Sequence, residues 1–270
     1  MKKYIFILFL PCFCLLSYGQ ITIEGQVVNK TGLPIAYASI GLENDSTGTI
    51  SDLNGNFKYT FNSNSNKFIK VTHVSYMTKL LPYSTYSDRH KLTIELTDKN
   101  VALPELSISA NAVKPKGRVN KGLRIPSDVK FSGEANNREC GPYIKSRKKI
   151  LISDIIIKVK ECTYTECTLS VNIYKMNGKN NMNNILNKPL YYNVKRNTNK
   201  LDLNIRPHED IILEKGQKYY ISLRIVDEKS DGHISFPLYM KHNLVRNYTN
   251  GTKHSIPVGL SFSVIGKEIQ

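Results

Sequence analysis

Residues 24–57 determine how the first part of this chain folds. They contain Glu24-Gly25-Gln26-Val27-Val28-Asn29, then Gly32-Leu33-Pro34-Ile35-Ala36-Tyr37-Ala38-Ser39-Ile40, then Gly48-Thr49-Ile50-Ser51-Asp52-Leu53-Asn54-Gly55-Asn56-Phe57. Apolar residues alternate in the first two runs, and Asn29-Lys30-Thr31-Gly32 between them has the composition of a turn. Another run follows the turn-forming cluster at 52–56. Short alternating runs separated by turn residues predict β-strands.

The same pattern extends through residues 20–98. Ala36, Ala38, Ile40 and Leu42 fall on one face of a strand, which predicts that this strand is half-buried. Gly48 is expected to take a turn conformation that a β-branched residue would resist. Asn54-Gly55 is a type I′ hairpin signal that places Phe57 on the core side. The predicted strands are 21–29, 35–43, 49–51, 56–61, 68–73 and 92–96.

This stretch resembles the carboxypeptidase-regulatory-like domain, a small transthyretin-like, Ig-like β-sandwich. Thr72-His73-Val74-Ser75-Tyr76 is similar to the family's later "x-x-x-G-Y" element, with Ser75 in place of glycine, and residues 101–109 are similar to a strand that leads toward the plug of family receptors. In bacteria the domain is common at the envelope, alone or at the front of TonB-dependent outer-membrane receptors. The resemblance implies a scaffold that carries no chemistry of its own.

The N-terminus predicts export. Lys2 and Lys3 precede a short apolar stretch, and Ser17 and Gly19 are small residues at the positions that a signal peptidase reads. The apolar stretch is shorter than the ~20 residues that span a bilayer. We therefore predict a signal peptide at residues 1–19. Lipidation at Cys12 or Cys14 is disfavoured, because neither follows the usual small-residue triplet, and the chain is expected in the periplasm or at the outer membrane or cell surface.

The length suits two domains. The chain has 270 residues, and removal of the first 19 leaves 251. We predict a first sandwich at 20–98, a linker strand and basic linker at 99–124, and a second, jelly-roll-like β-sandwich at 125–270, so the fold class is all-β. In the second domain the predicted strands are 150–158, 169–174, 190–194, 201–205, 219–226, 234–239 and 258–265.

The chain is strongly basic, with a formal net charge of +16, and residues 101–150 hold eleven of its 38 Lys and Arg residues. One interpretation is a solvated linker and a charged strand edge that resists aggregation. The other is contact with acidic envelope lipid or polysaccharide, for which the candidate residues are Lys145, Arg147, Lys148 and Lys149. Nucleic-acid binding is not expected, because no aromatic residues are interleaved with the basic ones to stack on bases.

Three cysteines remain after residue 19, namely Cys140, Cys162 and Cys167. Cys162 and Cys167 flank a segment that reads as a hairpin loop, so they are candidates for a small disulfide if their Cα atoms lie within about 7 Å. Three reduced, partly buried thiols are the alternative. A zinc site is not expected, because no second close pair of Cys or His completes four ligands.

Signals for catalysis are missing from the sequence. The six histidines occur in no His-x-x-Glu motif, and no Gly-x-Ser-x-Gly or phosphate-binding Gly-rich motif is present. The carboxylate pairs Glu209-Asp210 and Asp227-Glu228 are interpreted as solvated loop residues. We therefore expect no enzyme activity and no cofactor.

The expected function is binding or scaffolding. The partner is predicted to be another envelope protein, with outer-membrane transport machinery as one candidate, met at a sheet edge or at sandwich-end loops. The alternative is polysaccharide binding by the second domain, for which tyrosines could stack on sugars. In Tyr191-Tyr192 and in Tyr219-Tyr220, however, one member of each pair is expected in the core. Peripheral membrane contact is a further expectation.

Overall fold

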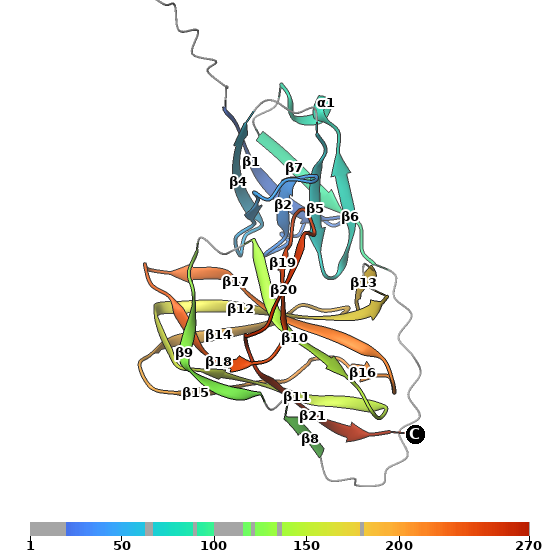
Figure 1. Cartoon of the computed structure of the whole chain (residues 1–270). Coiled ribbons are helices and arrows are strands. Elements are labelled where there is room, and N and C mark those ends of the chain that lie inside the picture. The colour runs from blue at the N-terminus through green and yellow to red at the C-terminus, as the bar shows by residue number, and fades with distance from the viewer. Residues whose placement is uncertain are drawn as a thin grey trace, which may run out of the picture.

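The computed structural model describes residues 20–62, 67–88, 91–99, 116–119, 122–133, 137–178 and 181–269, with the side chains of 116–119 excepted. These residues form β1 to β21 and one helical turn, α1 (Tyr83–Tyr86), so the all-β prediction is confirmed. The predicted signal peptide at 1–19 and the segment 101–109 lie outside the described residues. Figure 1 shows a smaller first part stacked on a larger second part.

The first part has two facing sheets. One has the order β4-β1-β7, with β4 antiparallel and β7 parallel to the central strand, and the other has the order β3-β2-β5-β6. The strands are β1 (Gln20–Asn29), β2 (Ser39–Leu42), β3 (Thr49–Ile50), β4 (Asn56–Asn62), β5 (Ile69–His73), β6 (Tyr76–Leu81) and β7 (Lys91–Leu96).

Alternating side chains fill the space between these sheets. On β4 the residues Phe57, Tyr59 and Phe61 are buried while their neighbours are exposed, as the period-2 pattern predicts. The side chains of Ile40 on β2 and Ile69 on β5 are fully buried in the same core. The prediction that Phe57 faces the core is confirmed.

Two turns of the first part are built alike. In residues 29–32 and 52–55, the fourth residue is a glycine with positive φ, +79° at Gly32 and +74° at Gly55. The Oδ1 atom of Asn29 accepts hydrogen bonds from the backbone N–H groups of Thr31 and Leu33. In the same way, Oδ1 of Asp52 accepts hydrogen bonds from the backbone N–H groups of Asn54 and Asn56. The positive φ at the last glycine alone is typical of a type I turn with a G1 bulge. The predicted type I′ turn at Asn54-Gly55 is therefore wrong, since Asn54 does not share the positive φ.

The second part has two larger sheets. The first has the order β20-β19-β10-β17-β12-β18-β9, with β13 and β14 also paired to β12, and the second has the order β15-β11-β21-β8, with β16 paired to β11. The strands are β8 (Lys116–Val119), β9 (Leu123–Phe131), β10 (Arg138–Lys145), β11 (Ile150–Val159), β12 (Glu161–Asn177), β13 (Asn181–Asn184), β14 (Leu190–Asn197), β15 (Leu201–Ile205), β16 (Ile212–Leu213), β17 (Lys218–Lys229), β18 (Ile234–Met240), β19 (Asn243–Asn247), β20 (Lys253–Ile256) and β21 (Phe262–Glu268).

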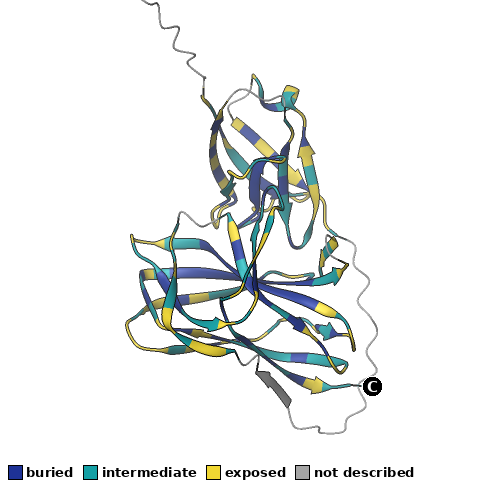
Figure 2. Ribbon diagram, in the orientation of Figure 1, coloured by how far each residue is buried: buried dark blue, intermediate teal, exposed yellow. Residues whose placement is uncertain are grey.

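A continuous apolar core lies between these two sheets, and Figure 2 shows the buried central strands. Strand β17 contributes Tyr219, Ile221, Leu223 and Ile225 to it, every second residue. The intervening residues of β17 are buried as well, so Tyr219 and Tyr220 are both almost fully buried. The prediction that only one of this pair lies in the core is wrong, because a second layer covers the other face of the sheet.

Candidate functional site

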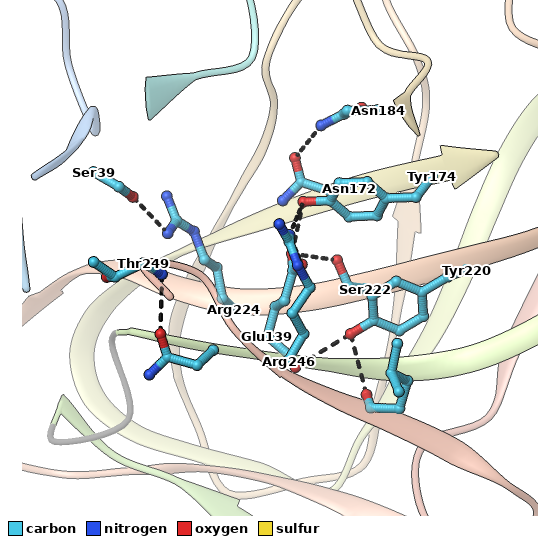
Figure 3. Close-up of polar contacts among 12 residues, drawn as sticks. Ser39, Glu139, Asn172, Tyr174, Asn184, Tyr220, Ser222, Arg224, Arg246 and Thr249 are labelled. Atoms are coloured by element: carbon cyan, nitrogen blue, oxygen red, sulfur yellow. Dashed lines mark hydrogen bonds and ion pairs between the residues drawn. The ribbon is translucent and has the colours of Figure 1, made fainter. Parts of the chain in front are cut away.

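Polar side chains gather on the face of the nine-stranded sheet opposite the core. They come from four neighbouring strands, and Figure 3 shows them converging beneath the first part of the chain. The central members are Glu139 on β10, Tyr174 on β12, Ser222 and Arg224 on β17, and Arg246 on β19. We call these five residues the polar layer.

Glu139 is the centre of the polar layer. Its side chain is fully buried, and one carboxylate oxygen lies 2.7 Å from Nη1 of Arg246. The other oxygen accepts hydrogen bonds from the hydroxyls of Ser222, at 2.7 Å, and Tyr174, at 3.1 Å. A buried carboxylate with three donors is compensated for its lost hydration. Burial, together with the nearby charge of Glu139, raises the pKa of Tyr174 well above its ordinary value, so this tyrosine remains a hydrogen-bond donor.

Arg224 connects the polar layer to the first part. Its side chain is buried, and Nη1 donates to Oγ of Ser39 on β2 at 2.9 Å. The guanidinium carbon lies 4.0 Å from the centre of the Tyr248 ring, within the range of a cation–π contact. Ser39 and Arg224 are 185 residues apart in the sequence. This bond therefore joins one sheet of each part.

The turn between β19 and β20 fits against β2. The Cγ2 atom of Thr249 lies 2.3 Å from where a Cβ on Gly41 would be, and its Oγ1 lies 2.8 Å from a Cβ position on Gly48. Gly48 does not have a positive φ, so its small size is required by close packing rather than by a turn conformation, and that prediction is corrected. Ser46 completes the contact, because its carbonyl oxygen accepts hydrogen bonds from the side-chain amides of both Asn137 and Asn247.

The turn between β5 and β6 forms a second contact. Val74 packs into the apolar core of the second part. His73 lies beside it, with Nε2 3.4 Å from the hydroxyl of Tyr191 on β14. Tyr191 also packs edge-to-face on Tyr37, at 4.9 Å between ring centres. Burial, with the charges of Arg224 and Lys99, lowers the pKa of His73 to about 4, so His73 is neutral at pH 7. The element that resembles the family's "x-x-x-G-Y" thus contacts the second part.

These contacts explain why β2 is not half-buried. Ile40 and Leu42 face the core of the first part, while Ser39 and Gly41 face Arg224 and Thr249. Every residue of the strand is buried. The prediction that this strand is half-buried is wrong, because the second part covers the face that was expected to be exposed to solvent.

A cleft of about 520 Å³ opens beside the contact, between the loop of residues 46–50 and strand β17. Asp227 and Glu228 line it from β17, so their interpretation as loop residues is wrong. Asp227 accepts a 3.4 Å hydrogen bond from the hydroxyl of Tyr37. The described residues bring no Ser, Cys or Lys nucleophile into this lining together with a histidine base.

The residues predicted to contact polyanions lie together at the end of β10 and in the turn that follows it. Lys145 ends β10, and Arg147 to Lys149 form the turn before β11. Lys148 forms an ion pair with Glu268, while Arg147 is exposed. The prediction of polyanion binding at this turn stays a prediction.

Cys162 and Cys167 both lie in the single strand β12, so the predicted hairpin loop between them is wrong. Both side chains are buried, and both thiols are free in this structure. The thiol of Cys140, which is partly buried, is also free. Burial raises the pKa of Cys140 to about 12 and also raises that of Cys167.

Among the described residues, no group of three or more His, Cys, Asp or Glu side chains is placed to hold a metal ion. Within the same residues, no helix has the length and hydropathy needed to span a membrane.

Sequence reasoning identified strand β17 but not the role of its polar face. The missed residues are Ser39, Gly41, Arg224, Arg246 and Thr249. A signal was available in β17, where Ser222 and Arg224 alternate with apolar residues. Alternation alone predicts a solvated polar face, so the signal does not name the partner that covers it.

Comparison with known proteins agrees with the resemblance of the first part. Residues 23–108 match the family model described as "CarboxypepD_reg-like domain". The TonB-dependent receptor SusC of Bacteroides thetaiotaomicron is 27% identical over 128 residues, which is 43% of this chain and 12% of the receptor. The first part is therefore a CarboxypepD_reg-like domain related to a region of a TonB-dependent receptor, and this chain spans about an eighth of that receptor's length.

Two solved structures of infectious bursal disease virus are similar over 93% of this chain at 8% identity. The Gt strain structure has a TM-score of 0.29 with 61% of its chain covered, and the Gx strain structure has a TM-score of 0.25 with 64% covered.

Proposed function

We propose that this chain, which carries a CarboxypepD_reg-like domain in its first part, is a non-catalytic docking protein of the bacterial envelope. In this proposal the protein is exported, its two parts act as one rigid body, and its partner is another envelope protein. Relatedness to a region of a TonB-dependent receptor supports outer-membrane transport machinery as the class of partner.

The observation that carries the proposal is the buried contact between the two parts. A flexible spacer would be joined to its neighbour by few contacts, mostly polar and exposed. Here a buried arginine, a turn packed against two glycines and an apolar side chain from the first part all cross the boundary. The first part is thus held at a fixed orientation on the second, which suits a module that positions a partner.

The outer face of the sheet β3-β2-β5-β6 offers a surface for docking. Its lower end is covered by the second part through Ser39 and Gly41. Further along the same face Phe68 is 43% exposed and Leu80 is 45% exposed, and Met77 on the edge strand β6 is 55% exposed. Lys70 is paired with Leu80, which places Phe68 and Leu80 as diagonal neighbours on this face. An exposed apolar group beside a sheet edge is a typical site for a partner strand.

The experiment is a pull-down of residues 20–270 from detergent-solubilised envelope, at low and at moderate salt, with mass spectrometry of the retained proteins. We expect one envelope protein to be retained at both salt levels and lost with Leu80→Glu. The matched control is Leu33→Glu, which changes a 62% exposed leucine outside this face and should keep the partner. Retention of no protein at moderate salt would contradict the proposal.

A further inference from the structure

A second cleft, remote from the contact between the two parts, lies at the end of the second sandwich. Strands β9, β15 and β18, which border it, lie together at the lower left of Figure 1. Its volume is about 320 Å³. The lining residues are Arg124, Lys158, Val159, Lys160, Lys200, Asp202, Pro237 and Tyr239. We call it the basic cleft.

The basic cleft has an excess of positive charge. Four of its lining residues are cationic, and Asp202 is the one carboxylate among them. Asp202 pairs with Lys158, while Asp128, just outside the lining, pairs with both Arg124 and Lys160 at 2.6 Å. Among the described residues Lys200 forms no ion pair. Four cations and two carboxylates leave a net charge of +2, which favours an anionic ligand.

Arg124 is held in position for such a ligand. Its Nη1 donates to the carbonyls of Ile125, Ser127 and Leu238, and its Nη2 donates to Asp128. The side chain nevertheless remains 42% exposed. An ordered guanidinium that still reaches solvent costs less entropy when it binds an anion than a mobile lysine does.

The size and the walls of the cleft favour a ligand larger than an inorganic anion. At about 30 Å³ per water, the cleft has the volume of about ten water molecules. Pro237 and the ring of Tyr239 form an apolar wall, and the Arg124 guanidinium lies 5.9 Å from the centre of that ring. Asp202 is 53% exposed and can accept hydroxyl hydrogen bonds. A sugar ring presents an apolar face, hydroxyl donors and, when acidic, a negative charge.

We propose that the basic cleft binds an anionic saccharide, that is, a sugar unit carrying a carboxylate, sulfate or phosphate. The acidic group would contact Arg124 and Lys200, the sugar face would pack on Tyr239, and hydroxyls would reach Asp202. This site is separate from the basic turn at 145–149, and it does not depend on the proposed protein partner.

The test is titration calorimetry of residues 20–270 with oligogalacturonate, with its methyl ester as the neutral saccharide of the same backbone. We expect saturable binding of the acid form, at least about tenfold weaker binding of the ester, and a similar loss in the variant Arg124→Gln/Lys200→Gln. The matched control, Arg147→Gln/Lys149→Gln, removes two charges from the basic turn and should change affinity less than about threefold. Tyr239→Ala should weaken binding of the acid saccharide but not of inorganic sulfate.

Several outcomes would overturn the proposal. Equal losses in both double variants would assign binding to general surface charge, and equal affinity for acid and ester would remove the anionic requirement. Binding of sulfate as tight as that of oligogalacturonate would show that the cleft does not recognise a saccharide. Binding to vesicles of anionic phospholipid, without binding to the saccharide, would identify a membrane surface as the ligand instead. Thermal unfolding of each variant distinguishes these outcomes from loss of folding, and the envelope pull-down reports the protein partner separately.

Discussion

Arg224 on β17 donates a 2.9 Å hydrogen bond to Ser39 on β2, and both side chains are at most 4% exposed. The two residues belong to different sheets in different parts of the chain. A buried guanidinium needs partners, and here Ser39 and the face of Tyr248 supply them from opposite sides of the boundary between the halves. The orientation of the CarboxypepD_reg-like domain is therefore linked to the interior of the second part.

Replacement of Arg224 by methionine should uncouple the two parts. It removes a charged hydrogen bond and a cation–π contact, so we expect a loss of about 2 kcal/mol in the free energy of unfolding. We expect a single unfolding transition in calorimetry of the natural protein and two transitions for the variant. The exposed Arg147→Met is the control, and unchanged single-transition unfolding of Arg224→Met would contradict the predicted link.

Replacement of Gly41 by alanine should force the β19–β20 turn away from β2. The new Cβ would lie 2.3 Å from Cγ2 of Thr249 and 2.8 Å from the carbonyl oxygen of Thr47. We expect destabilisation of about 1–3 kcal/mol, as for other overpacked sites, measured by urea unfolding. The second change Thr249→Ser removes the Cγ2 atom and should restore part of the loss. Failure of this rescue would show that Thr47, not the turn, limits the space at Gly41.

Many strands of each sandwich could be predicted from the alternation of apolar and polar residues, because a strand with one buried face has an apolar residue at every second position. The strands that were missed do not show this alternation. In β10 the Gly141-Pro142 pair reads as a turn, yet Gly141 is needed there because a Cβ would lie 1.8 Å from the carbonyl oxygen of Ile221. On β6, Met77 and Leu80 are exposed apolar residues, so no period-2 pattern is visible.

The contact between the two parts could not be predicted in the same way. Its residues are separated by up to 201 positions, as in the bond from Asn247 to Ser46. Each side alone reads as an ordinary solvated face, with serine and glycine on β2 and serine and arginine on β17. These small and polar residues form an interface only because the sheet that contains β2 packs on the sheet that contains β17.

Glu139 should be far more sensitive to substitution than the surface carboxylates. Glu139→Gln removes the charge of a fully buried carboxylate and leaves the Arg246 guanidinium, whose side chain is 20% exposed, without its counter-ion; breaking a buried ion pair typically costs about 3–5 kcal/mol. The matched change Glu166→Gln disrupts the exposed pair with Lys229 and should alter stability little. Chemical denaturation of both variants makes the comparison, and similar midpoints would show that the polar layer does not stabilise the fold.

His73 should make stability depend on pH. Because its pKa is lowered to about 4, the unfolded chain binds a proton below pH 6.5 that the folded chain does not. Stability should therefore fall as the pH decreases from about 6.5 to about 4, by at most about 3 kcal/mol. His73→Gln cannot bind this proton, so its urea midpoint should be flatter across the same range. Parallel pH profiles for the variant and the natural protein would exclude His73 as the cause.

The cysteines should behave as three free thiols of low reactivity, two of them buried and Cys140 partly buried. Burial raises the pKa of Cys140 to about 12, so little thiolate forms at pH 8, and Cys162 and Cys167 lie in the core of the second part. Residues 20–270, purified without reductant, should not react with a thiol reagent while folded and should release three equivalents on unfolding in denaturant. One equivalent would instead identify a disulfide between Cys162 and Cys167. Cys140→Ala then separates the two cases, because it should leave two reactive thiols if those of β12 are free and none if they are joined.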